Sequence, residues 1–426
     1  MKNNNKKLFF LELNEFNFEF LKKKSSELNL PYVKKIFELN HKQFKCDKLI
    51  EHFGLDPWTQ WVNIHTGKKS DDHGLFQIGM SDKLKYKQFW DTLSNKGVKS
   101  GVWGSMNIKN FKSKNNLIFL PDPWNFSEKI KPNYLYLFFK FPKYLFKNFL
   151  NLNLFKVLFN FILFFIYLLF SGKIFLLIFK FFNIAKFLVG KSINKYYFYP
   201  IFDWLNTIIF LSYKKKFKLD LSILFINLVA TLQHRIWDDE NRKDENNFSL
   251  YVLDNILKEI FYSLDSNEKI IISNGLSQEK LKNLHFHYRQ IDPIKFFHNF
   301  GITDFVIEQN MTNDGFLFFN KKESFDNAIN IIKNININGS NLLYCEEIKN
   351  KTGFCIFFMI TYISEISNNT KISLFDNNYN ALSLIALDAI RTGQHTPITN
   401  CLSNLIFNSD EEYNFKIHDY VDRYFD

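Results

Sequence analysis

Short apolar runs alternate with amphipathic segments along most of the chain. Residues 7–14 form the first apolar run, and Phe16, Phe20 and Leu21 follow at helical spacing within residues 15–24. The same order recurs, with strands predicted over 99–103, 219–228 and 269–273 and helices over 30–39, 88–95 and 248–263. Helices that alternate with buried strands are typical of a parallel sheet covered on both faces. The pattern therefore predicts an α/β fold with a mostly parallel sheet.

Two segments depart from this alternation. Residues 129–202 are hydrophobic and rich in lysine, which predicts a helical insert, and residues 291–365 have the pattern of a small α+β subdomain with a helix over 324–334. The predicted division is 1–128 for the N-terminal part of the core, 129–202 for the insert, 203–290 for the continued core, 291–365 for the subdomain and 366–426 for the C-terminal part of the core.

The insert contains a nearly uncharged run over residues 157–170. Its length of about 14 residues is shorter than the ~20 that a single helix needs to cross a bilayer. Two membrane arrangements remain, namely a hairpin that turns near Ser171 and Gly172 or helices that lie in the plane of the membrane interface. Lysines interleaved with phenylalanines favour the second arrangement. A buried helical subdomain is the alternative that involves no membrane.

The charge of the chain is concentrated in the same insert. The 426 residues carry a formal net charge of +11, and no acidic residue but eleven lysines occur between Glu128 and Asp203. The rest of the chain is close to neutral, which argues against a nucleic-acid-binding surface. An anionic membrane surface is the charged partner that we expect for the insert.

The cysteines and the N-terminus bear on the compartment. Cys46, Cys345, Cys355 and Cys401 show no close pairing, so neither a disulfide scaffold nor a Cys-based zinc site is indicated, and a reducing compartment fits. The first apolar run is cut by Glu12 and is too short for a secretory signal. We therefore expect a cytoplasmic, membrane-associated protein.

The most informative stretch is PWTQWVNIHTGKKSDDHG, residues 57–74. It contains neither Gly nor Pro from Trp58 to Thr66, and Gly67 then provides a left-handed helix end, so a helix is predicted with Thr59 in its first turn. The first N–H groups of a helix have no internal partners and favour a bound anion. A buried, capped structural helix is the alternative interpretation.

This stretch resembles the nucleophile helix of the alkaline phosphatase superfamily, in particular its type I phosphodiesterase and nucleotide pyrophosphatase branch. In that branch a nucleophilic Thr precedes a helix that ends in Thr-Gly, and a His-Gly turn follows. The nucleophile stands ten residues before the Gly, a place that Pro57 occupies here, whereas Thr59 stands eight before it. The resemblance implies Thr59 as the catalytic nucleophile if the helix start is shifted.

The resemblance also implies metal ligands at the front of the chain. A metal-binding Asp ends the first strand in this superfamily, and Asn14 stands at that place, with Glu12 two residues earlier on the same face of the strand. A later strand ends Ser-Asp-His-Gly in the superfamily but SNGL here, so Asn274 replaces the Asp and Gly275 the His. For Asn14, capping of the following helix is the alternative.

Two histidines match ligands toward the rear. The superfamily has an Asp, three residues and a His, and His234 fits the second position while Ala230 stands at the first. His395, in the sequence RTGQHTP, matches the late His of a Gly-x-His motif. With fewer carboxylates than usual, this set would hold at most one divalent metal, with zinc as the ion that the superfamily implies. A different ion, or no ion, is the alternative.

Two functions follow from these residues. The first is a metal-dependent hydrolase or transferase that acts on a phosphate ester, of a lipid or surface-glycan precursor at a membrane. The second is a catalytically degenerate relative that uses the pocket to bind an anion or a partner.

Overall fold

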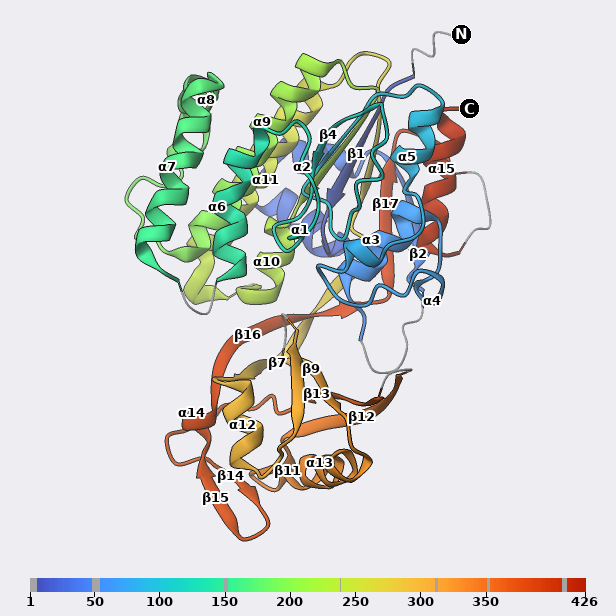
Figure 1. Cartoon of the computed structure of the whole chain (residues 1–426). Helices are drawn as coiled ribbons and strands as arrows, with labels where there is room; N and C mark the ends of the chain where they lie inside the picture. The colour runs from blue at the N-terminus through green and yellow to red at the C-terminus, as the bar shows by residue number, and fades with distance from the viewer. Residues whose placement is uncertain are drawn as a thin grey trace. The chain divides into compact units, whose positions relative to one another are not determined.

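The computed structural model describes residues 6–47, 54–148, 152–237, 239–310, 313–350, 353–407 and 412–426. The chain divides into two compact units: unit 1 comprises Met1–Glu279 and His395–Asp426, and unit 2 comprises Lys280–Gln394. The elements are labelled in Figure 1.

Unit 1 is built on a seven-stranded sheet. The strand order is β2 (Asn40–Lys45), β17 (Ile398–Ser403), β6 (Lys269–Ser273), β1 (Leu8–Leu13), β5 (Leu221–Ile226), β3 (Ser100–Trp103) and β4 (Asn116–Leu120). The five strands from β6 to β4 are parallel, while β17 is antiparallel to both of its neighbours. The predicted α/β fold with a mostly parallel sheet is confirmed.

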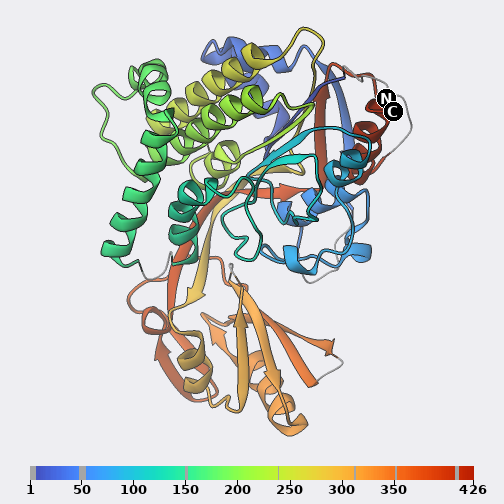
Figure 2. The same cartoon turned by 45° about the horizontal axis from the view of Figure 1, so that its top comes forward.

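Helices cover both faces of this sheet, because alternate residues of β1 are apolar on both sides. Phe9 and Leu11 pack into one buried cluster and Leu8 and Phe10 into another. Figures 1 and 2 show the two helical layers. One contains α1 (Phe18–Glu27), α2 (Pro31–Ile36), α9 (Lys195–Phe217) and α11 (Lys243–Ser263), and the other contains α3 (Pro57–Thr66), α5 (Phe89–Asn95) and α15 (Ile417–Tyr424).

Two short helices follow elements of the core directly or after a short loop. The helix α4 (Ser70–His73) follows α3, and α10 (Leu228–Arg235) follows β5 directly. The predicted helix over 58–66 is confirmed, and Gly67 ends it with a φ of 66° as its sequence indicated.

The insert is helical, as predicted, with α6 (Leu135–Lys147), α7 (Leu154–Phe170) and α8 (Lys173–Ala185). The break between α7 and α8 falls at the expected Ser171 and Gly172. No single helix in the described part of the chain is long and apolar enough to cross a membrane; α7 and α8 meet the requirement only as a pair, bent by 97°. The predicted end at residue 202 falls inside α9, which continues into the core.

Unit 2 contains two small antiparallel sheets. One has the order β12 (Leu343–Asn350), β13 (Gly353–Ile360), β9 (Asp314–Phe319), β8 (Phe305–Gln309), and the other β11 (Ser340–Asn341), β10 (Asn336–Ile337), β14 (Lys371–Leu374), β15 (Asn377–Asn380). The helices are α12 (Pro293–Asn299), α13 (Lys322–Asn334) and α14 (Ala381–Leu384). The unit is longer than the predicted 291–365, because β14 and β15 belong to the same sheet as β10.

The chain enters unit 2 along β7 (Ser277–Gln290) and returns along β16 (Ile385–Thr396), and these two strands pair with each other. Residue His395 therefore comes directly after unit 2 in the chain but belongs to unit 1.

Candidate metal centre

Glu15 stands where the chain leaves the central strand. β1 ends at Leu13, and the N–H of Asn14 still donates to the Ile226 carbonyl of β5 at 2.9 Å. Glu15 then adopts a left-handed backbone conformation with a φ of 57°, and its N–H donates to the Asn274 carbonyl at 2.9 Å. This conformation is uncommon for a residue with a side chain. The turn holds the Glu15 carboxylate at the carboxyl end of β1, between the ends of β5 and β6.

Two histidines reach the same edge from other elements. His234 lies in α10, whose start is fixed because the Asp203 carboxylate accepts the N–H groups of Asn227 and Leu228 at 2.8 and 2.6 Å. His395 lies near the end of β16, immediately before β17. Since β17 runs antiparallel to β6, its first residues lie at the carboxyl end of β6.

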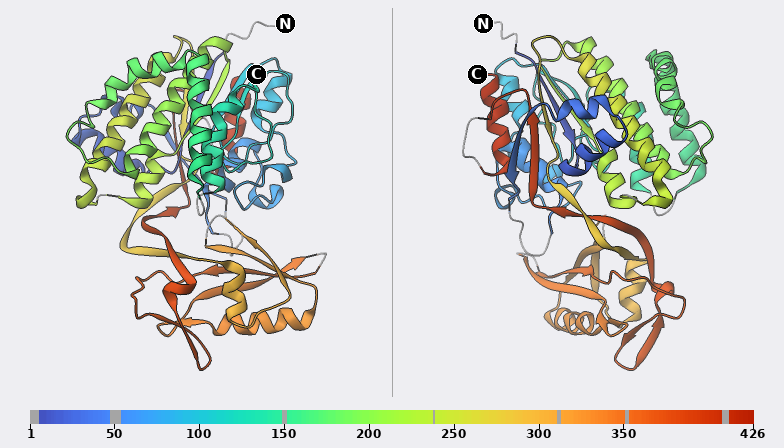
Figure 3. Two further views of the ribbon diagram at one scale, coloured as in Figure 1. Left: turned by 60° about the vertical axis from the view of Figure 1, so that its left-hand side comes forward. Right: turned by 180° about the vertical axis from the view of Figure 1, so that it is seen from behind.

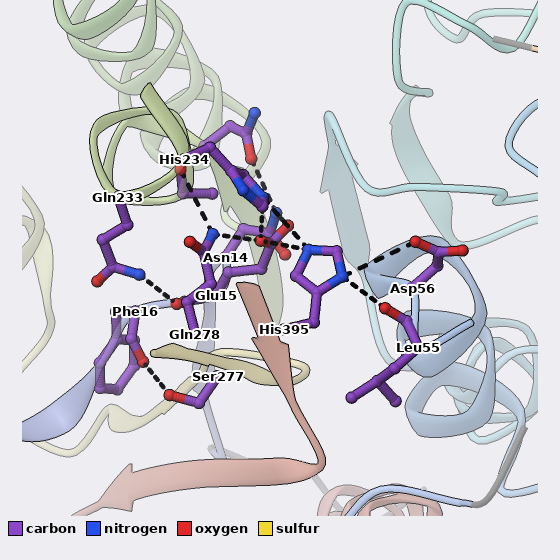
Figure 4. Close-up of polar contacts among 12 residues, drawn as sticks. Asn14, Glu15, Phe16, Leu55, Asp56, Gln233, His234, Ser277, Gln278 and His395 are labelled. Atoms are coloured by element: carbon purple, nitrogen blue, oxygen red, sulfur yellow. Dashed lines mark hydrogen bonds and ion pairs between the residues drawn. The ribbon is translucent and has the colours of Figure 1, made fainter. Parts of the chain in front are cut away.

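The three side chains converge on one point (Figure 4). The Oε2 atom of Glu15 lies 2.8 Å from Nε2 of His234 and 3.0 Å from Nε2 of His395, and the two Nε2 atoms are 3.2 Å apart. The Glu15 side chain is 4% exposed, whereas those of His234 and His395 are 17% and 13% exposed. The cluster is therefore buried on its carboxylate side and partly open on its imidazole side.

The electrostatics of Glu15 favour the carboxylate form. Burial by itself would raise the pKa of this carboxyl group, but the charges and hydrogen bonds of His395 and His234 outweigh it and hold the pKa well below its usual range. An anionic oxygen thus faces two imidazoles within a buried site, which is the state in which a carboxylate binds a cation.

The ring of His395 is oriented by the segment that leads into α3. Its Nδ1–H donates to the Leu55 carbonyl at 2.5 Å, and the Asp56 carboxylate lies 3.8 Å from the same nitrogen. In the neutral ring with its proton on Nδ1, Nε2 offers a lone pair to a cation, whereas in the protonated ring the same atom carries the N–H that contacts Glu15. Metal-binding histidines have this arrangement, in which the second ring nitrogen donates to a carbonyl or carboxylate.

The donor set fits one divalent cation. Two imidazoles and a glutamate are a ligand set of catalytic zinc sites, which leave the fourth position of the tetrahedron for water or substrate. Ligand atoms in such a tetrahedron are about 3.3 Å apart for bonds of about 2.0 Å. The observed separations of 2.8, 3.0 and 3.2 Å are close to that value. Among the described residues, this is the one group of three such side chains whose ligand atoms meet.

The fold of the chain is similar to that of a solved nucleotide pyrophosphatase/phosphodiesterase. A structure of murine ectonucleotide pyrophosphatase/phosphodiesterase 5, inactive and in complex with AMP, has a TM-score of 0.52 at 9% sequence identity, over 99% of this chain and 95% of that chain. A second structure of the murine protein gives 0.50 at 10% identity over the same shares. A phosphonoacetate hydrolase from Sinorhizobium meliloti 1021, in complex with phosphonoformate, gives 0.48 at 10% identity over 99% and 96%.

The chain has the fold of the alkaline phosphatase superfamily. By sequence alone, no family model matches the chain and no curated protein is significantly similar to it. The resemblance first noticed in the sequence is thus confirmed for the fold, and the individual superfamily positions can be located in the structure.

The predicted ligands His234 and His395 lie together, but the carboxylate beside them is Glu15, which the sequence did not predict. Ala230 stands where the superfamily has an Asp, four residues before His234. Glu15 supplies a carboxylate from β1 instead. The available signal was an acidic residue one position beyond the expected metal-binding place at Asn14.

Asn14 supports Glu15. Its amide nitrogen donates to Oε1 of Glu15 and to Oδ1 of Asn227, both at 2.8 Å, and its oxygen accepts the indole N–H of Trp61 at 2.8 Å. The oxygen that would bind a metal is therefore engaged by Trp61. In this arrangement Asn14 acts as a positioning residue beside the cluster.

The second metal position of the superfamily has a different structure here. The side chain of Asn274 donates to the Phe16 carbonyl and accepts the N–H of Asn400, both at 2.8 Å. Gly275 has a φ of 71°, and a Cβ atom there would lie 2.8 Å from the ring of Trp61. Trp61 and the engaged side chains of Asn14 and Asn274 thus lie at the positions of the second ligand set.

Glu12 contacts the covering helix α3. Its Oε1 atom is 2.6 Å from Nε2 of His65 in α3, and both side chains are fully buried. The structure therefore pairs Glu12 with a histidine of the covering helix and does not bring it to Glu15, His234 and His395.

Thr59 lies in the first turn of α3, as predicted, and its hydroxyl is engaged by a backbone carbonyl. It donates to the Leu75 carbonyl at 3.1 Å, and the residue is 1% exposed. The helix start itself borders the cluster through Leu55 and Asp56. Among the described residues, no polar contact joins Thr59 to the side chains of Glu15, His234 and His395. Its role as nucleophile stays a prediction.

Proposed function

We propose that this chain is a metal-dependent hydrolase or transferase of phosphate esters that works with one divalent cation. The observation that carries the proposal is the convergence of Glu15 Oε2 with the Nε2 atoms of His234 and His395 at the carboxyl edge of the sheet. Ligands of open α/β sheets bind at this edge. The superfamily fold and the zinc-type donor set support the same reaction class.

The residues of the cluster and their neighbours would have two roles, binding of the cation and positioning of its ligands. Glu15, His234 and His395 would hold the cation, and Leu55 and Asn14 keep the ring of His395 and the carboxylate of Glu15 in place. A cation held there supplies positive charge that stabilises a phosphoryl oxygen and lowers the pKa of a bound hydroxyl or water. The start of α3 adds the positive end of a helix dipole beside it.

The nucleophile of the proposal is Thr59. To act, its hydroxyl would have to exchange the Leu75 carbonyl for the substrate, a rotation about one side-chain bond. Thr59→Ala should abolish turnover with metal content unchanged, whereas Thr59→Ser should retain part of it. Full turnover in Thr59→Ala would show that water, and not Thr59, is the nucleophile.

The test of the metal centre combines metal analysis with turnover. We expect about one zinc per purified chain and hydrolysis of bis(4-nitrophenyl) phosphate, and we expect both to be lost in Glu15→Gln, His234→Ala and His395→Ala. His298→Ala, which changes an exposed histidine of α12, is the matched control and should keep both. Equal metal content in all four variants would contradict the proposed centre.

A second candidate is a binding module without catalysis. The buried, engaged hydroxyl of Thr59 and the proline at position 57 favour it, because they leave the superfamily nucleophile position without a reactive group. In that case the purified protein would bind one metal and a phosphate ester such as AMP with no hydrolysis by either Thr59 or water.

The finer parts of the proposal concern the substrate and its location. We place the substrate, a lipid or surface-glycan precursor, at the cytoplasmic side of a membrane. The Lys-rich insert supports the membrane, and the four cysteines, which are all free thiols, support a reducing compartment. Cell fractionation with antibody detection of the native chain tests both.

A further inference from the structure

The helix α7 is apolar on the face that it exposes as well as on the face that it buries. Phe164, Tyr167 and Leu168 are buried, and α7 packs on α6. On the opposite side of the helix, Phe155 is 86% and Ile162 47% exposed. A helix that is apolar all round is typical of a segment surrounded by protein or by lipid.

The helix α8 repeats this pattern. Leu177 and Ile184 are buried, and α8 packs against α9 and α11. Phe175, Phe179 and Phe182, at positions i, i+4 and i+7, are 75%, 80% and 70% exposed and form one outward stripe. Figure 3 shows α7 and α8 on the outside of unit 1, so no other described element of unit 1 covers these two stripes.

Positive charge borders the apolar stripes. Lys156 in the first turn of α7 is exposed, and Nζ of Lys140 lies 5.3 Å from the centre of the exposed Phe159 ring. Beyond the end of α8, Lys186 and Lys195 are exposed as well. No acidic residue occurs between positions 128 and 203, so every charged side chain of this segment is a lysine.

Two other lysines of the insert fix its orientation. Lys180 of α8 forms an ion pair with Glu259 and Lys191 one with Asp244, both on the side of α11. These contacts attach the inner side of the insert to the core. The phenylalanine stripes consequently remain on the outer side.

We propose that the outer faces of α7 and α8 form a docking surface that lies in the plane of an anionic lipid bilayer. Interfacial helices with phenylalanine on one side and lysine at the border bind in this way, with the apolar face among the lipid chains and the charges at the headgroups. The 97° bend between the two helices prevents them from forming one straight crossing. A second copy of the chain is a poor occupant, because it would bring two lysine-rich surfaces together.

This surface is independent of the proposed catalysis, and its test uses the full chain and vesicles. We expect the protein to float with vesicles of equal parts phosphatidylglycerol and phosphatidylcholine. Binding to vesicles of phosphatidylcholine alone should be weaker by a factor of about ten or more. The triple variant Phe175→Ser, Phe179→Ser, Phe182→Ser should lose flotation while its metal content stays at that of the wild type. Phe375→Ser with Val306→Ser, two exposed apolar residues of unit 2, is the matched control and should float normally.

The other outcomes would overturn the proposal. Equal flotation of wild type and triple variant would exclude these helices as the lipid contact. A wild-type dimer that becomes monomeric in the triple variant, without vesicle binding, would assign the surface to a second copy. Resistance of the bound protein to alkaline carbonate would indicate a hairpin inserted through the bilayer and would exclude the in-plane arrangement.

Discussion

At the scale of single residues, the carboxylate of the candidate centre comes from Glu15, one position beyond the residue that the sequence indicated. The sequence identified His234 and His395 by their spacing, but it directed attention to Asn14 and Glu12 as the oxygen ligands. The structure shows that Glu12 faces His65 and that Asn14 binds Trp61, whereas Glu15 faces the histidines. Strand alternation alone could not reveal this, because the left-handed turn at Glu15 ends the alternation.

His73 provides a residue-scale prediction about pH. Its Nδ1 atom accepts the N–H of Leu75 at 3.0 Å and its Nε2–H donates to Asn63 at 2.6 Å, so the ring has no site for a second proton. Burial lowers the pKa of His73 to about 4. Between that value and the unfolded pKa of about 6.5, the unfolded chain binds more protons, so the free energy of unfolding should fall by up to roughly 3 kcal/mol as the pH drops from 7 to 4.

Urea unfolding of wild type and His73→Gln across this pH range measures the effect. The variant should be less stable at pH 7, since it loses the paired imidazole, but its stability should depend less on pH. Parallel curves for the two proteins would show that His73 does not titrate in the expected window.

At the scale of elements, the strongly patterned segments were predictable and the polar ones were not. The apolar strands β1 and β6 and the capped helix α3 lie close to their predicted ranges. The strand β17 was not predicted because four of its buried residues are Thr399, Asn400, Cys401 and Ser403, which give no apolar run. The edge strand β2 buries only Phe44 among its six residues.

The end of α3 provides an element-scale prediction with its own control. Gly67 and Gly74 have φ values of 66° and 65°, and alanine at either should cost about 1 kcal/mol or more in the free energy of unfolding. A Cβ atom at Gly67 would also lie 3.0 Å from the His418 ring of the last helical segment, whereas one at Gly74 would meet nothing within 4 Å.

Gly67→Ala should therefore destabilise the protein more than Gly74→Ala does in thermal or urea unfolding. The difference reports the contact between the end of α3 and α15, since the backbone term is common to both. Equal losses would mean that the ring of His418 moves aside at no cost.

At the scale of the whole molecule, the superfamily fold was predictable from the order of its motifs, but the extent of unit 2 was not. The late histidine follows a segment of unit 2 that pairs with β7, so the C-terminal part of the core begins at His395 and not at the predicted residue 366. The pairing of β7 with β16 joins segments far apart in the sequence, which local patterns do not report.

The division into units predicts that the metal centre does not require unit 2. All three proposed ligand residues belong to unit 1. The N–H of Ile291 donates to the Leu384 carbonyl at 3.0 Å, so residues 290 and 385 lie close enough for a short turn to join them. Replacement of residues 291–384 by a Gly-Asn turn should leave about one zinc per chain, measured by metal analysis of the folded, monomeric product. Loss of the metal from a chain that keeps its α/β circular dichroism would contradict this.

The positions of the three ligands along the chain have a consequence for biosynthesis. Glu15 is synthesised first, His234 next and His395 last of the three. A growing chain on the ribosome therefore carries the complete set of candidate ligands only after His395 has emerged. Binding of an ion by all three proposed ligands must follow the synthesis of His395.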